Sequence, residues 1–272
     1  MITLGLNYSQ MHDSSACIVR DGELLFAVVE ERISRLKHDA RFPQLAIQAC
    51  LDFAKISPSQ IDEVCFGWQT PGATFRHDLK LFATGRWPVS YLSVLNSARQ
   101  FASMGHQGGG ARRFAQRFGS AKARFRFVDH HFAHAISTYS YSGFDDAAIV
   151  IMDGRGAWEA TSIWRGSHGH IEHVQTINWP DSLGLFYARF TEFLGFTPNA
   201  DEWKVMGLAP YGKPGVNLGA FLEPEAAPYK VHSDLLLGEG SGSFAGWPVS
   251  LGSPRAAADG GTGDQPALLA AD

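Results

Sequence analysis

Two histidines stand four residues apart in the segment VDHHFAH, residues 128–134. The segment is expected to run from a short strand into a helix, where residues at i and i+4 share one face. His130 and His134 are therefore candidate ligands of one divalent metal. Asp153, at the end of the next predicted strand, is the expected third ligand. The alternative is that both histidines only cap and pack the helix.

Asp153 is followed by Gly154, Arg155 and Gly156. Two glycines beside a carboxylate, in a turn between strands, let backbone N–H groups approach a phosphate or a bound metal closely. The same residues also suit an ordinary turn. Taken alone, this segment does not decide between the two interpretations.

A second polar segment, His12-Asp13-Ser14-Ser15, lies in the first predicted hairpin. A histidine beside a carboxylate can act as a general base toward a hydroxyl group. The alternative is a polar turn in which Asp13 bonds the local backbone. The serines lack a Gly-x-Ser-x-Gly context, which argues against a serine hydrolase.

Two further segments carry weaker signals. Residues 201–214, DEWKVMGLAPYGKP, combine glycine, proline and lysine after a predicted helix, which fits a loop facing a nucleotide or an ordinary loop.

Residues 79–128 hold nine Lys or Arg and no acidic residue, which fits an anion-binding or nucleic-acid surface. We favour a solvated helix face for this stretch, because basic and aromatic residues do not interleave as a stacking surface requires.

The elements that must position these residues follow a repeated pattern. Strands are predicted at 2–7, 15–20 and 23–30, with Asp21-Gly22 as a hairpin turn. A helix is expected after Pro43, a strand at 61–66, and helical structure at 90–118 that Gly108-Gly109-Gly110 would break. Strands are then expected at 147–153, 160–165 and 170–179, followed by a helix at 181–196. A β-β-β-α order that occurs twice predicts a duplicated α/β fold.

The domain boundaries follow from this pattern. The first half-domain is expected to cover residues 1–145, with a helical insertion at about 76–120. The second is expected to begin in residues 146–237. In residues 238–272, Gly, Ala, Ser and Pro supply 22 of 35 positions, so this segment is expected to be a disordered or truncated low-complexity tail.

Composition restricts the class of protein. The chain has 272 residues, of which 45% are hydrophobic and 18% charged, so it is not disordered as a whole. A net charge of −4 argues against a basic nucleic-acid binder. Apolar runs do not exceed six residues and no cationic leader opens the chain, which predicts a cytoplasmic protein without membrane spans. Three cysteines without paired spacing are expected to be buried, reduced thiols.

Five motifs together resemble the O-carbamoyltransferase family, which includes nodulation-factor and antibiotic-tailoring carbamoyltransferases. The resemblance covers about residues 2–237. The motifs are MHDSSA (11–16), EERISRLKHD (30–39) before Phe42-Pro43, DHHFAH (129–134), MDG (152–154) and EWKVMGLAPYG (202–212). Their order and spacing make the resemblance specific.

The resemblance implies an actin/hexokinase/Hsp70-like fold of two half-domains, the second incomplete. It implies that a C-terminal domain, absent here, makes carbamoyl-adenylate from carbamoyl phosphate and ATP. The present domain would pass the carbamoyl group to a hydroxyl of a small-molecule or sugar acceptor. The implied metal is a divalent ion, iron first.

The resemblance also implies roles for single residues. His130, His134 and Asp153 would bind the metal, and His12 would be the base near the acceptor hydroxyl. The implied binding residues for the anionic intermediate and its nucleotide are Lys37, Gly154, Gly156, Lys204, Met206 and Gly207.

One departure from the family pattern concerns the turn after Asp153. The family carries an acidic residue soon after this turn, where the chain has Ala157, Trp158 and then Glu159.

Three alternatives stay open: a transferase like those making threonylcarbamoyladenosine on tRNA, an inactive truncated remnant, and a subunit completed by a partner chain. A homodimer is possible, a membrane partner is not expected, and a nucleic-acid partner is disfavoured by the net charge.

Overall fold

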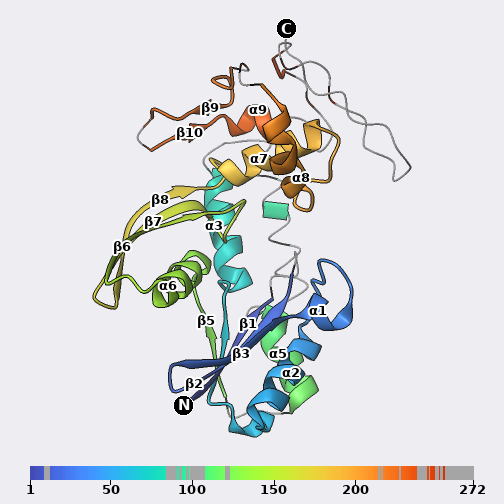
Figure 1. The fold of residues 1–272 in the computed structure, drawn as a ribbon, viewed down its shortest axis with the longest axis vertical. Coiled ribbons are helices and arrows are strands. Elements are labelled where there is room, and N and C mark those ends of the chain that lie inside the picture. Colours follow the sequence, from blue (N-terminus) through green and yellow to red (C-terminus); the bar gives the residue numbers. More distant parts are fainter. Residues whose placement is uncertain are drawn as a thin grey trace. The chain divides into compact units, whose positions relative to one another are not determined.

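The computed structural model describes residues 1–8, 13–83, 108–119, 123–213, 217–226 and 228–237, with a few single residues between and after these ranges. The chain divides into two compact units, residues 1–143 and 144–272 (Figure 1). In the described residues, no helix is both long and apolar enough to cross a lipid bilayer.

Unit 1 is built on a five-stranded mixed sheet with the order β3-β2-β1-β4-β5. The hairpins β1–β2 and β2–β3 are antiparallel, and the second turns at Asp21-Gly22, where both residues have positive φ. β4 and β5 add in parallel beside β1. The strands are β1 (Ile2–Asn7), β2 (Ser15–Arg20), β3 (Glu23–Val29), β4 (Glu63–Phe66) and β5 (Arg124–Phe127).

Helices complete unit 1. Pro43 immediately precedes α2, and the apolar residues Ala46, Ile47, Cys50 and Leu51 of that helix are buried against the sheet. This burial follows from the helical spacing of apolar residues seen in the sequence. The helical elements are α1 (Glu30–Ser34), α2 (Gln44–Ala54), η1 (Pro58–Gln60), α3 (Pro71–Ala83), α5 (Gly108–Phe118) and α6 (His130–Ser142).

Unit 2 begins with a three-stranded antiparallel sheet of order β6-β7-β8. Its described core lies mainly in the segments that follow the sheet, where Phe193, Phe221 and Trp247 pack together. Its elements are β6 (Asp146–Met152), β7 (Glu159–Ser167), β8 (His170–Asn178), α7 (Leu183–Phe193), α8 (Glu202–Leu208), η2 (Ala209–Tyr211), β9 (Leu222–Glu223), β10 (Lys230–Val231) and α9 (Ser233–Leu237).

The prediction of an α/β chain with a repeated β-β-β-α order is confirmed. Gly108-Gly109-Gly110 form the first turn of α5, and residues 101–107 lie outside the described residues, so the predicted break of the helix at these glycines stays a prediction. At Gly110 a Cβ would overlap the ring of Phe66, so a larger residue here would require that ring to move. The predicted helical insertion at 76–120 falls partly outside the described residues.

Most of the predicted low-complexity tail, residues 238–272, lies outside the described residues. Phe244, Trp247 and Leu251 contribute to the core of unit 2, since aromatic side chains compensate for a segment otherwise poor in apolar residues. Of the three cysteines, which were expected to be buried, Cys50 is buried and Cys17 and Cys65 are half-buried. Residues 255–272 lie outside the described residues.

Candidate functional site

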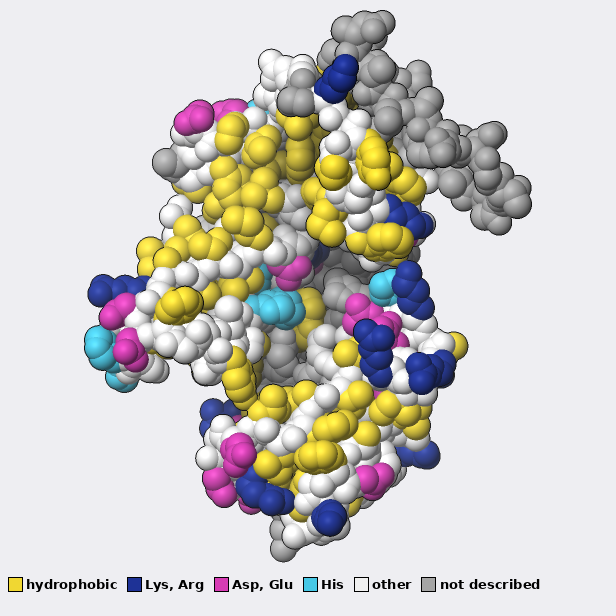
Figure 2. All heavy atoms as spheres, in the orientation of Figure 1, with side chains coloured by type: hydrophobic (Ala, Val, Ile, Leu, Met, Phe, Trp, Pro, Cys, Tyr) yellow, Lys and Arg dark blue, Asp and Glu magenta, His cyan; other side chains and the backbone are white. Residues whose placement is uncertain are grey.

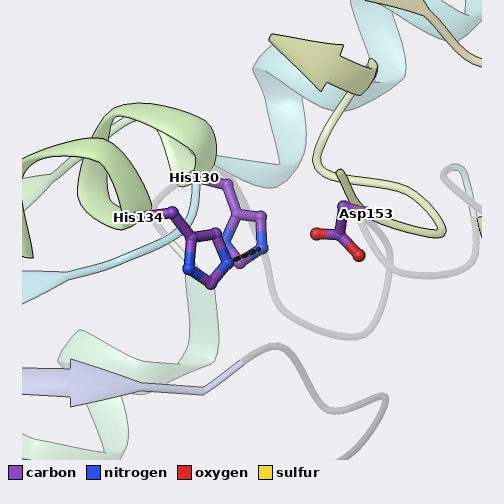
Figure 3. A group of neighbouring side chains, drawn as sticks. All are labelled: His130, His134 and Asp153. Carbon is purple, nitrogen blue, oxygen red and sulfur yellow. Dashed lines mark hydrogen bonds between the residues drawn. The ribbon is translucent and has the colours of Figure 1, made fainter. Parts of the chain in front are cut away.

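The imidazoles of His130 and His134 face each other on the first turns of α6 (Figure 3). The helix begins at His130 because the carboxylate of Asp129 accepts a hydrogen bond from the backbone N–H of Phe132, 2.9 Å away. The two Nε2 atoms are 3.1 Å apart. Helical spacing in the sequence therefore does produce a pair of imidazole nitrogens directed at one point.

Neighbouring residues fix the ring of His130. Its Nδ1 lies 2.9 Å from the carbonyl oxygen of Gly67, and a carbonyl can only accept, so Nδ1 carries the proton. Nε2 is then a lone-pair donor. The indole of Trp68 stacks on this imidazole at 3.7 Å and is itself held by a 2.8 Å bond to Asn7 Oδ1. Contacts of this kind orient the histidine ligands of metals.

This donor pair fits a divalent transition metal. Two nitrogens bound to one ion at about 2.0–2.1 Å lie about 2.9–3.4 Å apart in octahedral or tetrahedral geometry. The observed Nε2–Nε2 distance of 3.1 Å falls within that range. The neighbouring His131 is fully buried.

Asp153 belongs to unit 2 and directly follows β6. Its backbone N–H donates to the carbonyl of Ala160 at 2.8 Å, which closes the base of the connection to β7. Its Oδ1 accepts the backbone N–H of Gly154 at 2.6 Å. Since the two histidines belong to unit 1, a metal site that uses all three residues stays a prediction.

The two glycines of the predicted phosphate-facing turn differ in environment. Gly154 is half-buried, and a Cβ at this position would meet nothing within 4 Å. Gly156 is buried, and its N–H donates to the carbonyl of Glu159 at 2.7 Å. That N–H is therefore used within the turn.

The predicted nucleotide-facing residues lie on α8 of unit 2. Lys204 forms a 2.8 Å ion pair with Asp201, and its ammonium lies 5.6 Å from the ring centroid of Phe196. The Lys204 ammonium holds the pKa of the Asp201 carboxyl below its usual range. Met206 is 66% exposed, and a Cβ at Gly207 would meet nothing within 4 Å. Figure 2 shows hydrophobic side chains gathered over the α7–α8 part of unit 2.

His12 lies outside the described residues, and Lys37 is exposed in a turn. Near Lys37 in the chain, the structure brings together a group of polar side chains that the sequence interpretation missed. Ligand atoms of Asp13, Glu31 and His38 lie within 4.8 Å of one another, a set able to hold a metal ion. Asp13 Oδ1 is 3.2 Å from His38 Nδ1, and Glu31 accepts the His38 backbone N–H at 3.0 Å. The sequence signal was the density of polar residues in MHDSSA, which holds Asp13, and in EERISRLKHD, which holds Glu31 and His38.

Ser14 connects this group to the following loop. Its buried hydroxyl lies 2.8 Å from the carbonyl of Asp39 and 2.5 Å from that of Arg41. The side chain of Asp39 is buried, and the Arg41 guanidinium holds the pKa of this carboxyl well below its usual range. The segment around Asp13 is therefore fastened to residues 38–41.

Known proteins show where this chain belongs. It is 37% identical over 209 residues to the uncharacterized protein sll1178 of Synechocystis, and 35% identical over 221 residues to the nodulation protein NolNO of Sinorhizobium fredii. These matches cover 75% and 80% of the chain but only 34% and 30% of the relatives. The chain thus spans about a third of their length.

Similarity to solved structures is lower. YeaZ from Pseudomonas aeruginosa is 15% identical, with a TM-score of 0.38 over 66% of this chain and 70% of that one. The Aquifex aeolicus Ppx/GppA phosphatase is 11% identical, with a TM-score of 0.34 over 80% and 66% of the two chains. In contrast, the family model "Carbamoyltransferase N-terminus" matches residues 2–236. The chain therefore belongs to the carbamoyltransferase N-terminus family.

Proposed function

We propose that this chain is the carbamoyl-transferring part of an O-carbamoyltransferase acting on a small-molecule or sugar hydroxyl in the cytoplasm. The donor in this proposal is carbamoyl-adenylate, made from carbamoyl phosphate and ATP by a C-terminal adenylate-forming domain. Membership of the family supports the reaction class. The observation that carries the site is the pair of Nε2 atoms of His130 and His134, 3.1 Å apart.

In the proposed reaction, the acceptor oxygen attacks the carbonyl carbon of carbamoyl-adenylate. A new C–O bond forms, the bond from that carbon to the phosphate oxygen breaks, and AMP leaves with the electron pair. The hydroxyl proton passes to a base, for which His12 is the candidate. Lys37, Gly154, Gly156, Lys204, Met206 and Gly207 are the proposed contacts to the anionic donor and its nucleotide.

His130, His134 and Asp153 are the proposed ligands of a divalent metal, iron first. When bound, such an ion supplies Lewis-acid stabilisation of the acyl or phosphate oxygens and a template for orientation. The chain's own part is to present His130 Nε2 as a lone-pair donor, through the Gly67 carbonyl at its Nδ1 and Trp68 stacked on its ring.

The test is metal content after purification with Fe²⁺, compared between the wild type and the His130→Ala/His134→Ala double variant. We expect the double variant to lose most of the bound metal. The matched control is His168→Asn/His170→Ala, which removes two exposed histidines from unit 2. Equal metal content in the wild type and the α6 double variant would exclude the proposed site.

A second candidate function is carbamoyl-type transfer to tRNA, as in the threonylcarbamoyladenosine-forming transferases. It is favoured by α5, where Phe114 is buried while Arg112, Arg113 and Arg117 are exposed. Part of the basic stretch is compensated, because Arg126 pairs with Glu63 at 2.9 Å. A tRNA gel shift that weakens steeply with salt would favour this function. Absence of binding at every salt concentration would end it.

A further inference from the structure

The Asp153–Gly154 segment packs directly on the start of α7, an element of the same unit. Ser182 is the N-cap of α7, and its fully buried hydroxyl accepts the backbone N–H of Leu185 at 3.0 Å. The same hydroxyl lies 3.0 Å from the carbonyl of Asp153 and 2.8 Å from that of Gly154. A hydroxyl has one proton and two acceptor sites, so Ser182 caps the helix and donates to the segment simultaneously.

The second contact is made by Gly184, in the first turn of α7. A Cβ at this position would lie 2.5 Å from Gly154 Cα, 2.6 Å from its nitrogen and 2.9 Å from the carbonyl carbon of Asp153. All three atoms are backbone, so no side chain can rotate away to make room. Any residue larger than glycine at 184 must displace either α7 or the Asp153–Gly154 segment.

The segment is also fastened from the side of its own sheet. The Asp153 N–H donates to Ala160 on β7, and the Asp153 carboxylate accepts the N–H of Gly154. The orientation of that carboxylate therefore depends on the peptide plane between Asp153 and Gly154. Ser182 and Gly184 both contact backbone atoms of these two residues.

We propose that Ser182 and Gly184 are positioning residues that set the direction of the Asp153 carboxylate. The inference rests on the proposed function only in treating Asp153 as a metal ligand. Ser182 acts by donating to the carbonyls of residues 153 and 154, and Gly184 acts by permitting backbone contact. Such outer partners of ligands typically change metal affinity by about 10- to 100-fold.

The first measurement is hydrogen–deuterium exchange of residues 153–158 in the chain without metal. Ser182→Ala is expected to speed exchange there by roughly 3- to 10-fold, as expected for loss of one hydrogen bond. Gly184→Ala is expected to speed it as well, because the added Cβ displaces the Asp153–Gly154 backbone. Ser182→Thr retains a capping hydroxyl and should restore slow exchange. The matched control is Thr191→Val, which removes another fully buried hydroxyl of α7, bonded to the Tyr187 carbonyl at 2.9 Å.

The second measurement is a titration with Co²⁺, followed by its visible absorption. Ser182→Ala and Gly184→Ala are expected to weaken binding by about 10-fold or more, while Ser182→Thr and Thr191→Val stay near the wild type. Thermal unfolding of every variant separates loss of positioning from loss of the fold. If Gly184→Ala does not fold, the comparison of Ser182→Ala, Ser182→Thr and Thr191→Val still decides.

The two proposals fail in different ways. If wild-type Co²⁺ binding does not depend on His130, His134 and Asp153, the proposed metal site is wrong. If exchange at residues 153–158 is the same in Ser182→Ala, Gly184→Ala and Thr191→Val, the positioning role is wrong, whatever the metal titration gives.

Discussion

The two units share the order strand-strand-strand-helix but bury different parts of themselves. In unit 1 the sheet is the core: β1 pairs on both edges, and Leu4 and Leu6 are almost fully buried. In unit 2 the corresponding first strand, β6, leaves Val150 49% and Met152 64% exposed. The largest described apolar cluster of unit 2 lies instead around Phe193, Phe221 and Trp247.

A repeated order of strands and helices therefore does not determine which residues of a unit form its buried core. Alternating residues and Asp-Gly or His-Gly turns are sufficient to form the hairpins in both units. The location of the core depends on which later segments pack on the sheet. In unit 1 these are α2, α5 and the parallel strands β4 and β5, which contribute to one apolar cluster.

The largest loss of stability is expected from a substitution in the aromatic core of unit 2. Phe221→Ala removes a fully buried ring that packs edge-on against Phe190 and Trp247. We expect a loss of about 3–5 kcal/mol in the free energy of unfolding of that unit. Urea unfolding followed by tryptophan fluorescence measures it. Phe144→Ala, at a 68% exposed position, is the control and should change stability little.

The next prediction compares the loss of stability caused by substitutions in the first strands of the two sheets. Leu4→Ala on β1 removes a fully buried side chain, and we expect it to cost about 2–5 kcal/mol. Val150→Ala on β6, 49% exposed, is expected to cost less than about 1 kcal/mol. Chemical denaturation of both variants measures the difference. Similar losses in the two variants would contradict the view that position 150 of β6 contributes less to a core than position 4 of β1.

The smallest effect concerns acid stability. The Arg41 guanidinium lowers the pKa of Asp39 in the folded chain below its unfolded value of about 3.9. This interaction therefore stabilises the fold above about pH 4 and is lost as the pH falls below it. Asp39→Asn should lower stability at pH 7 and flatten the decline between about pH 5 and pH 2.

Unit 2 offers a matched variant for this pH test. The Lys204 ammonium also lowers the pKa of Asp201, but the pair bridges one turn of a short helix with a partly exposed lysine. We expect Asp201→Asn to change the pH profile less than Asp39→Asn. A larger change for Asp201→Asn would reverse this order.

Much of the candidate site could be predicted from the sequence because it depends on local geometry. The four-residue spacing of His130 and His134 gives a shared helix face wherever the helix lies. Asp129 caps that helix through a bond spanning three residues. The position of Asp153 at the end of a strand also follows from the strand pattern.

Other features depend on contacts between distant residues, for which the sequence carries no direct signal. The Gly67 carbonyl that selects the proton position of His130 lies 63 residues away from it. The close approach of Gly184 to Gly154 could not be predicted from the sequence, which shows only a glycine within a predicted helix. The Asp13–Glu31–His38 group joins residues from two separate segments of the chain, beside the hydrogen bond from Ser14 to the Asp39 carbonyl.

The sequence by itself therefore determined the hairpins, the helix that carries the two histidines and the family motifs, since each depends on neighbours along the chain. Tertiary structure decided which nitrogen of His130 is available, which backbone contacts hold the Asp153 carboxylate, and where each unit places its core. The physical reason is that hydrogen bonds and packing between distant segments depend on how those segments meet in space, which no spacing of residue types records.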